Sequence, residues 1–304
     1  MKGGVDFTDC ERVIGKAYNG ANGKKIAVIY EGHQYMLKFP PSGQSKPTEL
    51  SYTNSCFSEH IACRIFNMLE VTAQETLLGT FDVAGRTKVV CACRDFTADG
   101  RQLFDFCSIK NTIIDSDSNG NGTELSDILE TMDRQQFIEP GRLLAHFWEM
   151  FVIDALLGNF DRHNGNWGFL YDPGSKTTDI APVYDCGSCL LPQADEGVMQ
   201  SVLENEDALN QRIFRYPTSA IKIDGRKINY HDFLTRAEDK DCNAAVKRIY
   251  ERLDLEEISH FIEGIPYISD LQKAFYKCYI KARASLLLSP VHEMIVAGNV
   301  HFYH

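Results

Sequence analysis

The strongest constraint in this sequence is the crowding of strand-forming segments into the first third of the chain. Residues 24–30 are β-branched and apolar, Glu31-Gly32 provides a turn, and residues 34–39 alternate between apolar and polar side chains. This pattern is typical of a β-hairpin. Residues 76–81 and 88–93 follow the same plan, so we expect a second hairpin. Four strands of this kind predict a small antiparallel sheet.

One helix is predicted between the two hairpins, over residues 55–69, with Asn54 or Ser55 as its N-cap. Its apolar stripe has helical spacing and consists of Phe57, Ile61, Ile65 and Leu69. The first part of the chain is therefore expected to be a sheet that carries one helix.

The rest of the chain predicts mainly helices. A helix over Pro140–Leu157 has proline in its first turn, stops at Gly158 and presents a broad apolar surface. A third hairpin follows, with strands over residues 167–171 and 180–184. Further amphipathic helices are predicted around Val198–Leu209, Tyr230–Arg236, Asn243–Leu253 and Asp270–Leu288. These patterns together predict an α+β fold.

Composition excludes several classes of protein. A hydrophobic fraction of 44% over 304 residues is that of a globular chain and excludes wholesale disorder. No apolar stretch is long enough for a membrane helix, and residues 1–6 lack the apolar core of a secretory signal. A net charge of −11 argues against a protein that coats nucleic acid. We therefore expect a cytoplasmic protein that binds neither membranes nor nucleic acid directly, with export to another cell left open.

Two motifs that suggest metal binding have simpler interpretations. Cys186 and Cys189 have the spacing of zinc ligands or a redox pair, but no second pair has suitable spacing, so reduced core thiols are expected. Residues 115–126 resemble the start of a calcium loop. The bidentate glutamate is missing, because Ser126 stands at its position, and a polar surface loop is expected instead.

The segment with the most chemical content is residues 158–168, which follows the buried helix and leads into the third hairpin. The two ends of an antiparallel hairpin come together, so Asn166 and Asp185 should meet at its open end, with Asp161 nearby. Oxygen ligands for Mg²⁺ beside one separate carboxylate are what phosphoryl transfer requires. This segment therefore predicts a phosphotransferase centre.

The first part of the chain supplies matching features. A turn whose backbone amides can approach phosphates consists of Gly20, Ala21, Asn22 and Gly23. Lys38 points away from the apolar face of its strand, and Glu59 lies on the helix that can pack over the sheet. A strand lysine paired with a helical glutamate is the ATP clamp of protein kinases. A hinge that would offer backbone groups to adenine is expected at Arg94, Asp95 and Phe96. Each feature alone is more often a plain turn, cap or solvated charge, but their order favours a kinase.

The chain resembles the HipA-like serine/threonine kinases, and among them the short CtkA-like members. The resemblance rests on residues Gly20–Lys24, Met36–Pro40, Ser58–His60, Gly158–Asn166 and Ala181–Asp185. It implies a two-lobed kinase fold, ATP with Mg²⁺, and transfer of the γ-phosphoryl group to a protein hydroxyl. The N-lobe would span residues 1–96. The C-lobe would span residues 97–304, with the catalytic loop at 158–167 and the metal-binding hairpin at 166–187.

The resemblance also implies roles for single residues. Asp161 would be the catalytic base, Asn166 and Asp185 the Mg²⁺ ligands, Lys38 the phosphate clamp and Glu59 its partner. His163 would keep the catalytic loop in shape. The nucleotide would contact the glycine turn, Lys38, the hinge and the loop residues His163, Asn166, Tyr184 and Asp185.

Two departures from the longer toxin members limit the resemblance. The chain lacks their extra N-terminal subdomain, so an antitoxin partner cannot be inferred. The glycine turn has no Ser or Thr, so any autophosphorylation would use other hydroxyls, such as those of residues 42–58. Two alternatives to a protein kinase stay open, namely a small-molecule kinase of the same architecture and a non-catalytic nucleotide-binding module of the toxin type. The acceptor protein cannot be identified from the sequence.

Overall fold

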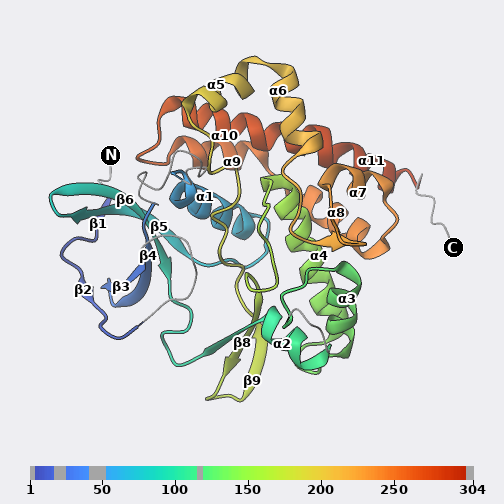
Figure 1. The fold of residues 1–304 in the computed structure, drawn as a ribbon. Helices are drawn as coiled ribbons and strands as arrows, with labels where there is room; N and C mark the ends of the chain where they lie inside the picture. Colours follow the sequence, from blue (N-terminus) through green and yellow to red (C-terminus); the bar gives the residue numbers. More distant parts are fainter. Residues whose placement is uncertain (1–3, 17–24, 41–52, 115–118, 299–304) are drawn as a thin grey trace.

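The computed structural model describes residues 4–16, 25–40, 53–114 and 119–298. Figure 1 shows a curled sheet on one side, a larger helical part on the other, and helix α1 (Ser55–Met68) between them. The described strands and helices confirm the predicted α+β class. The boundary that we predict at residue 96 falls in the connection between the last sheet strand and the helical part.

The sheet has six strands in the order β1-β5-β6-β4-β3-β2. The strands are β1 (Val5–Asp6), β2 (Glu11–Arg12), β3 (Lys25–Tyr30), β4 (His33–Lys38), β5 (Thr76–Val83) and β6 (Arg86–Arg94). Both predicted hairpins are present, as β3–β4 and β5–β6. Two short strands were not predicted: β1 pairs parallel with β5, and β2 extends the edge at β3. Strands of two residues are too short to show an alternation.

The two faces of this sheet bury different cores. One face carries a small cluster in which Tyr35, Leu37 and Phe39 pack together, as their alternation predicts. The other face receives α1 against β5 and β6. Asn54 precedes α1 but its side chain makes no capping bond there. Its Nδ2 instead donates to the carbonyl of Ala194 at 2.7 Å, which ties α1 to the helical lobe.

The helical lobe begins with a three-stranded sheet and two short helices. The sheet has the order β7-β8-β9. These elements are β7 (Gln102–Asp105), α2 (Phe106–Ile113), α3 (Leu125–Arg134), β8 (Gly168–Asp172) and β9 (Thr177–Ile180). The return strand of the third hairpin is therefore shorter and earlier than predicted. Beyond Ile180 the chain leaves the hairpin, and Val183 forms a parallel bridge with Ala73 at the N-terminal side of β5.

Helix α4 (Pro140–Leu157) forms the centre of the lobe and leads into the predicted catalytic loop at residues 158–167. Its predicted apolar surface is buried, with Phe147, Trp148 and Phe151 in the main core. Gly158 ends the helix in the left-handed region with φ of 64°. A Cβ at this position would lie 2.2 Å from the Tyr279 hydroxyl oxygen, so only glycine fits.

The remaining elements complete the helical lobe around α4. They are α5 (Glu196–Glu204), α6 (Glu206–Asn210), the π-helical turn η1 (Gln211–Arg215), β10 (Lys222–Ile223), β11 (Arg226–Lys227), α7 (Tyr230–Arg236), α8 (Lys240–Arg252), α9 (Leu255–Glu263), α10 (Asp270–Arg283), the π-helical turn η2 (Ala284–Leu288) and α11 (Ser289–Val296). The predicted helix over residues 198–209 is split at Asn205, whose side chain caps α6. Among the described residues, no helix is both long and apolar enough to span a membrane.

A half-buried histidine makes the stability of this fold depend on pH. His60 on α1 lies 2.9 Å from the Thr76 hydroxyl, and its ring packs near Phe261. Burial, aided by the charge of Arg64, lowers the pKa of His60 to about 4. The unfolded chain takes up a proton near pH 6.5 and the folded chain does not, so stability is fully present above pH 6.5 and falls towards pH 4.

We expect His60→Gln to flatten this pH dependence by on the order of 2 kcal/mol in the free energy of unfolding. Urea titrations at pH 7.5 and pH 4.5 measure the difference for the wild type and the variant. His146, whose pKa burial also lowers to about 4, should retain its own contribution in the variant. An unchanged difference between the two pH values would show that His60 accepts a proton in the folded protein.

Candidate active site

Lys38 joins the two lobes by contacting two carboxylates. Its Nζ lies 2.8 Å from Glu59 Oε2 and 2.9 Å from Asp185 Oδ1. Lys38 is the last residue of β4, Glu59 lies in the second turn of α1, and Asp185 follows the third hairpin. The Glu59 side chain is 1% exposed, that of Lys38 15% and that of Asp185 49%. The three residues predicted from separate segments therefore form one cluster that opens towards solvent at Asp185.

Charge and burial oppose each other in this cluster. Burial disfavours the Lys38 cation, but the carboxylates of Asp185 and Glu59 outweigh it and raise the pKa of Lys38 well above its usual value. The same cation holds the pKa of Asp185 at about 2, against the effect of burial. Burial raises the pKa of Glu59, and Lys38 opposes this. Lys38 and Asp185 are thus charged at neutral pH.

The catalytic loop is held by its own backbone and by Asn159. The buried Asn159 donates from Nδ2 to Asp154 Oδ1 at 2.8 Å, and its Oδ1 accepts from the Asp161 amide at 3.0 Å. Asn166 donates from Nδ2 to the Asp161 carbonyl at 2.8 Å. These bonds use the Asp161 backbone and leave its half-buried carboxyl group for chemistry. Burial raises the pKa of that carboxyl and the Asp185 carboxylate raises it further, whereas the charges of Lys227 and Arg162 oppose the rise.

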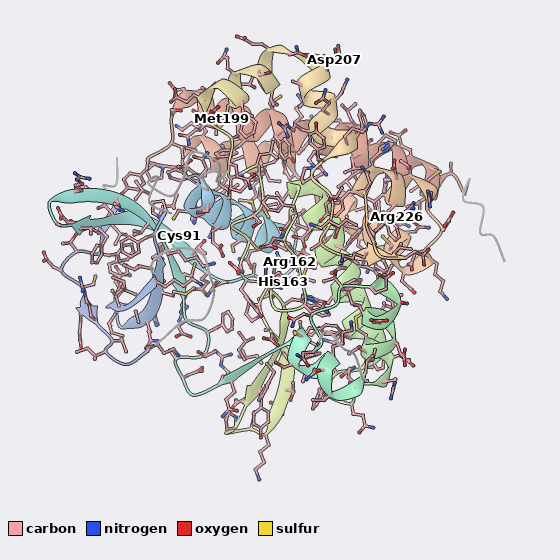
Figure 2. All side chains as sticks on the ribbon, in the orientation of Figure 1. Cys91, Arg162, His163, Met199, Asp207 and Arg226 are labelled. Carbon is pink, nitrogen blue, oxygen red and sulfur yellow. The ribbon has the colours of Figure 1, made fainter. Side chains whose placement is uncertain are left out.

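Arg162 supports the candidate site, a role that was not predicted from the sequence. Its side chain is 2% exposed, and Figure 2 shows it beside His163 at the centre of the molecule. Nε lies 2.9 Å from Asp154 Oδ2 on α4. Nη1 donates to the carbonyls of Asn166 at 3.0 Å and Tyr184 at 2.6 Å.

Through these two carbonyls, Arg162 holds together the two ends of the third hairpin. Asn166 and Asp185 were predicted to meet because the two strands pair. The strands actually separate after Ala181, whose amide still donates to the Gly168 carbonyl at 2.9 Å, and the Arg162 guanidinium group bridges the gap between Asn166 and Tyr184. Only the motif position of Arg162, directly after Asp161, could have signalled this role.

Two of the four predicted loop contacts to the nucleotide, His163 and Tyr184, differ in surroundings. His163 is exposed, and its Nδ1 accepts the Gly165 amide at 3.0 Å, which fits the loop-shaping role. Tyr184 donates from its hydroxyl to the Gly165 carbonyl at 3.1 Å. Its ring centroid lies 6.0 Å from that of Phe96, so the hinge segment and the end of the hairpin come together there.

Two backbone amides of the predicted hinge are bonded within the small sheet. The Arg94 amide donates to the Glu75 carbonyl at 2.8 Å, and the Asp95 amide donates to the Gln34 carbonyl at 2.9 Å. A contact of the hinge with adenine stays a prediction. The predicted glycine turn at Gly20–Gly23 lies outside the described residues.

Asn166 and Asp185 fit a Mg²⁺ site by the chemistry of their donor atoms. The Asn166 amide nitrogen is engaged with the Asp161 carbonyl, so the oxygen is the atom able to bind a cation. Asp185 contacts Lys38 through one oxygen and carries a second. Mg²⁺ prefers oxygen ligands and is usually held by one or two protein groups together with substrate phosphates. Accordingly, the described part of the chain has no cluster of three or more His, Cys, Asp or Glu residues suited to a metal.

Asp185 adopts a backbone conformation that few residues tolerate. Its φ is 58°, in the left-handed region that Asp and Asn enter more readily than other non-glycine residues. Strained positions of this kind gather at functional sites. The adjacent Gly187 lies close to the clamp, since a Cβ there would sit 3.2 Å from Glu59 Oε2.

The two cysteines with zinc-ligand spacing lie in the core. Cys186 and Cys189 are buried and unpaired by disulfides, as are most of the other cysteines. Cys186 accepts a hydrogen bond from Arg162 Nη2 at 3.2 Å and thus belongs to the structural core beneath Asp185. Residues 115–118 of the calcium-like loop lie outside the described residues.

Comparison with known proteins identifies the family. Residues 17–263 match the family model of the HipA-like C-terminal domain. A curated relative, the serine/threonine-protein kinase CtkA of Helicobacter pylori, is 50% identical over 96% of this chain and 89% of its own length. The crystal structure of the H. pylori proinflammatory kinase CtkA superposes with a TM-score of 0.89, at 48% identity, over 96% of this chain and 99% of that one. The chain therefore belongs to the HipA-like serine/threonine kinase family, and the two-lobed kinase-like fold is confirmed.

A more distant structure shares the fold. The HipA of Shewanella oneidensis, solved in a complex with HipB and operator DNA, matches with a TM-score of 0.50 at 17% identity. The match covers 92% of this chain and 68% of that one.

Proposed function

We propose that this protein transfers the γ-phosphoryl group of ATP, with Mg²⁺, to serine or threonine hydroxyls of a protein acceptor. The observation that carries the proposal is Lys38, whose ammonium group lies within 3 Å of both the buried Glu59 and the exposed Asp185. A lysine fixed by a helical glutamate beside a Mg²⁺-binding aspartate is the ATP clamp of kinases. Membership of a family with a named serine/threonine kinase at 50% identity supports the acceptor class.

Each residue then has a defined task. Lys38 contacts the nucleotide phosphates, and Glu59 keeps its ammonium group in place. Asp161 orients the acceptor hydroxyl and takes its proton as the oxygen bonds to the γ-phosphorus and the bond to ADP breaks. Asn166 and Asp185 would hold Mg²⁺, which supplies positive charge that offsets the charge on the phosphoryl oxygens. Arg162 holds the loop of Asp161 and the end of the hairpin at a fixed spacing.

Two other functions predict different results. A small-molecule kinase would use the same residues but would phosphorylate no protein. A non-catalytic nucleotide-binding module would have no need of the carboxyl group of Asp161, which its loop backbone leaves available.

Labelled ATP distinguishes the three functions. The protein is incubated with γ-labelled ATP and Mg²⁺, with a dialysed lysate in one arm and the small-molecule fraction of that lysate in the other. We expect label on proteins in the first arm, and none when EDTA replaces Mg²⁺. Label confined to small molecules would favour the first alternative, and nucleotide binding without turnover would favour the second.

Lys38→Met should lower the rate of phosphoryl transfer by about 10²- to 10³-fold, because it removes a fixed charge that stabilises the transferring group. The rate is measured at saturating ATP, and circular dichroism checks the fold. Lys88→Met serves as the control, since Lys88 lies on β6 of the same sheet but outside the cluster. If Lys38→Met transferred phosphoryl groups at the wild-type rate, Lys38 would not be part of the active site.

A further inference from the structure

A small basic hairpin lies beside the catalytic loop. Strands β10 and β11 pair so that Lys222 is directly opposite Lys227, and Ile223 opposite Arg226. Directly opposed residues of an antiparallel pair share one face, so the two lysines lie on one face and Arg226 lies on the other. Like charges in this position destabilise a strand pair. The opposed lysines thus lower the local stability of the hairpin, in a chain whose net charge is −11.

The two lysines lack a close ion-pair partner among the described residues. Neither Lys222 nor Lys227 forms an ion pair with a described carboxylate, and Lys227 is exposed. The nearby Glu124 accepts a hydrogen bond from the Gly225 amide at 3.1 Å, which fixes the turn. The lysine face is therefore a positively charged surface open to an external anion.

Both ends of the hairpin are anchored to the catalytic loop. Ahead of it, the Lys222 amide donates to the Thr123 carbonyl at 2.8 Å, and Asn164 of the loop donates to the neighbouring Gly122 carbonyl at 2.7 Å. Behind it, the Tyr230 hydroxyl donates to the Asn159 carbonyl at 2.6 Å. The position of Lys227 relative to Asp161 is thereby fixed, and its charge lowers the pKa of the Asp161 carboxyl against the effect of burial.

We infer that Lys222 and Lys227 form a subsite for an acidic side chain of the acceptor protein, next to the hydroxyl that Asp161 orients. This inference rests on the proposed function. The lysines belong to the helical lobe and follow the catalytic loop, whereas the phosphate clamp at Lys38 belongs to the sheet. An anion on the acceptor is thus the ligand that fits them. The substrate class is a protein segment with Asp or Glu near the phosphorylated Ser or Thr.

Matched peptides test the inference. A panel of serine-centred peptides is made in three versions, with flanking Asp/Glu, with Asn/Gln and with Lys/Arg. We expect kcat/KM to be about fivefold higher for the acidic version than for its amide counterpart, because exposed charge pairs contribute modestly. The preference should shrink in 0.5 M NaCl, which screens exposed charges.

Two variants show whether the acidic preference depends on the lysine face or on the hairpin as a whole. The double variant Lys222→Ala/Lys227→Ala should lose the acidic preference while the KM for ATP stays unchanged. Arg226→Ala, on the opposite face of the same hairpin, should keep the preference. Figure 2 labels Arg226 in the helical lobe, to the right of Arg162 and His163.

Three outcomes would overturn the inference. Equal kcat/KM for the acidic and amide peptides would overturn it and leave the proposed kinase function standing. A raised KM for ATP in the double variant, equal for every peptide, would assign the lysines to the nucleotide. If the wild type labelled neither any peptide nor any protein, the proposed function would fail and the inference with it.

Discussion

Asp161→Asn should lower the rate of phosphoryl transfer by about 10²- to 10⁴-fold, the usual contribution of a catalytic base. ATP binding should persist, because the Asp161 backbone, and not its carboxyl group, makes the bonds to Asn159 and Asn166 that hold the loop. Asparagine retains the shape of the side chain and loses the ability to take a proton. Single-turnover transfer and calorimetric binding of ATP measure the two properties separately.

The control for this prediction is Asp207→Asn. Asp207 is an exposed carboxylate on α6, and Figure 2 places it at the far end of the helical lobe from His163. This variant should transfer phosphoryl groups at the wild-type rate. Near-wild-type transfer by Asp161→Asn would show that another group takes the proton.

Asp154→Ala should cost about 3–5 kcal/mol in the free energy of unfolding, because it leaves the buried Arg162 cation without its carboxylate. Removal of this partner also releases the group that fixes the spacing of Asn166 and Tyr184. Transfer by the folded fraction should therefore fall as well, with little change in the KM for ATP. Urea unfolding gives the stability, and kcat is measured at a temperature at which the variant remains folded.

The exposed pair of Arg142 and Asp179 provides a matched control. Its atoms lie 2.7 Å apart, but the two side chains are 58% and 65% exposed. Asp179→Ala should cost less than about 1 kcal/mol, because water screens an exposed ion pair. If Asp154→Ala cost no more than Asp179→Ala, the proposed importance of the buried pair would be wrong. Asp154→Asn, which keeps the hydrogen-bond acceptor, should recover part of the loss.

Much of the fold could be predicted because its signals are local. The hairpins β3–β4 and β5–β6 have clear alternation and turn residues, and α4 has proline at its start and glycine at its end. Helices α2, α3, α9 and α11 were not predicted, although the shorter α7 was. The parallel bridge of Val183 with Ala73 depends on contact between the lobes, which no local pattern encodes.

The residues of the candidate site could be predicted, but the contacts that hold them in place could not. Motif order brought together Lys38, Glu59 and Asp185, and the structure joins them by ion pairs. The role of Arg162 was missed, because it depends on two carbonyls from segments that are distant in sequence. The bonds of the hinge amides to Glu75 and Gln34 could not be predicted for a similar reason, since strand pairing sets these partners.

The most direct test of a protein serine/threonine kinase is the location of the transferred phosphate. Wild type and Asp161→Asn are incubated in parallel with ATP, Mg²⁺ and a lysate, and phosphosites are mapped by mass spectrometry on the protein itself and on the lysate proteins. The account predicts new phosphoserine or phosphothreonine sites with the wild type and none above background with Asp161→Asn. The same sites at the same occupancy with both proteins, or none with either, would contradict it.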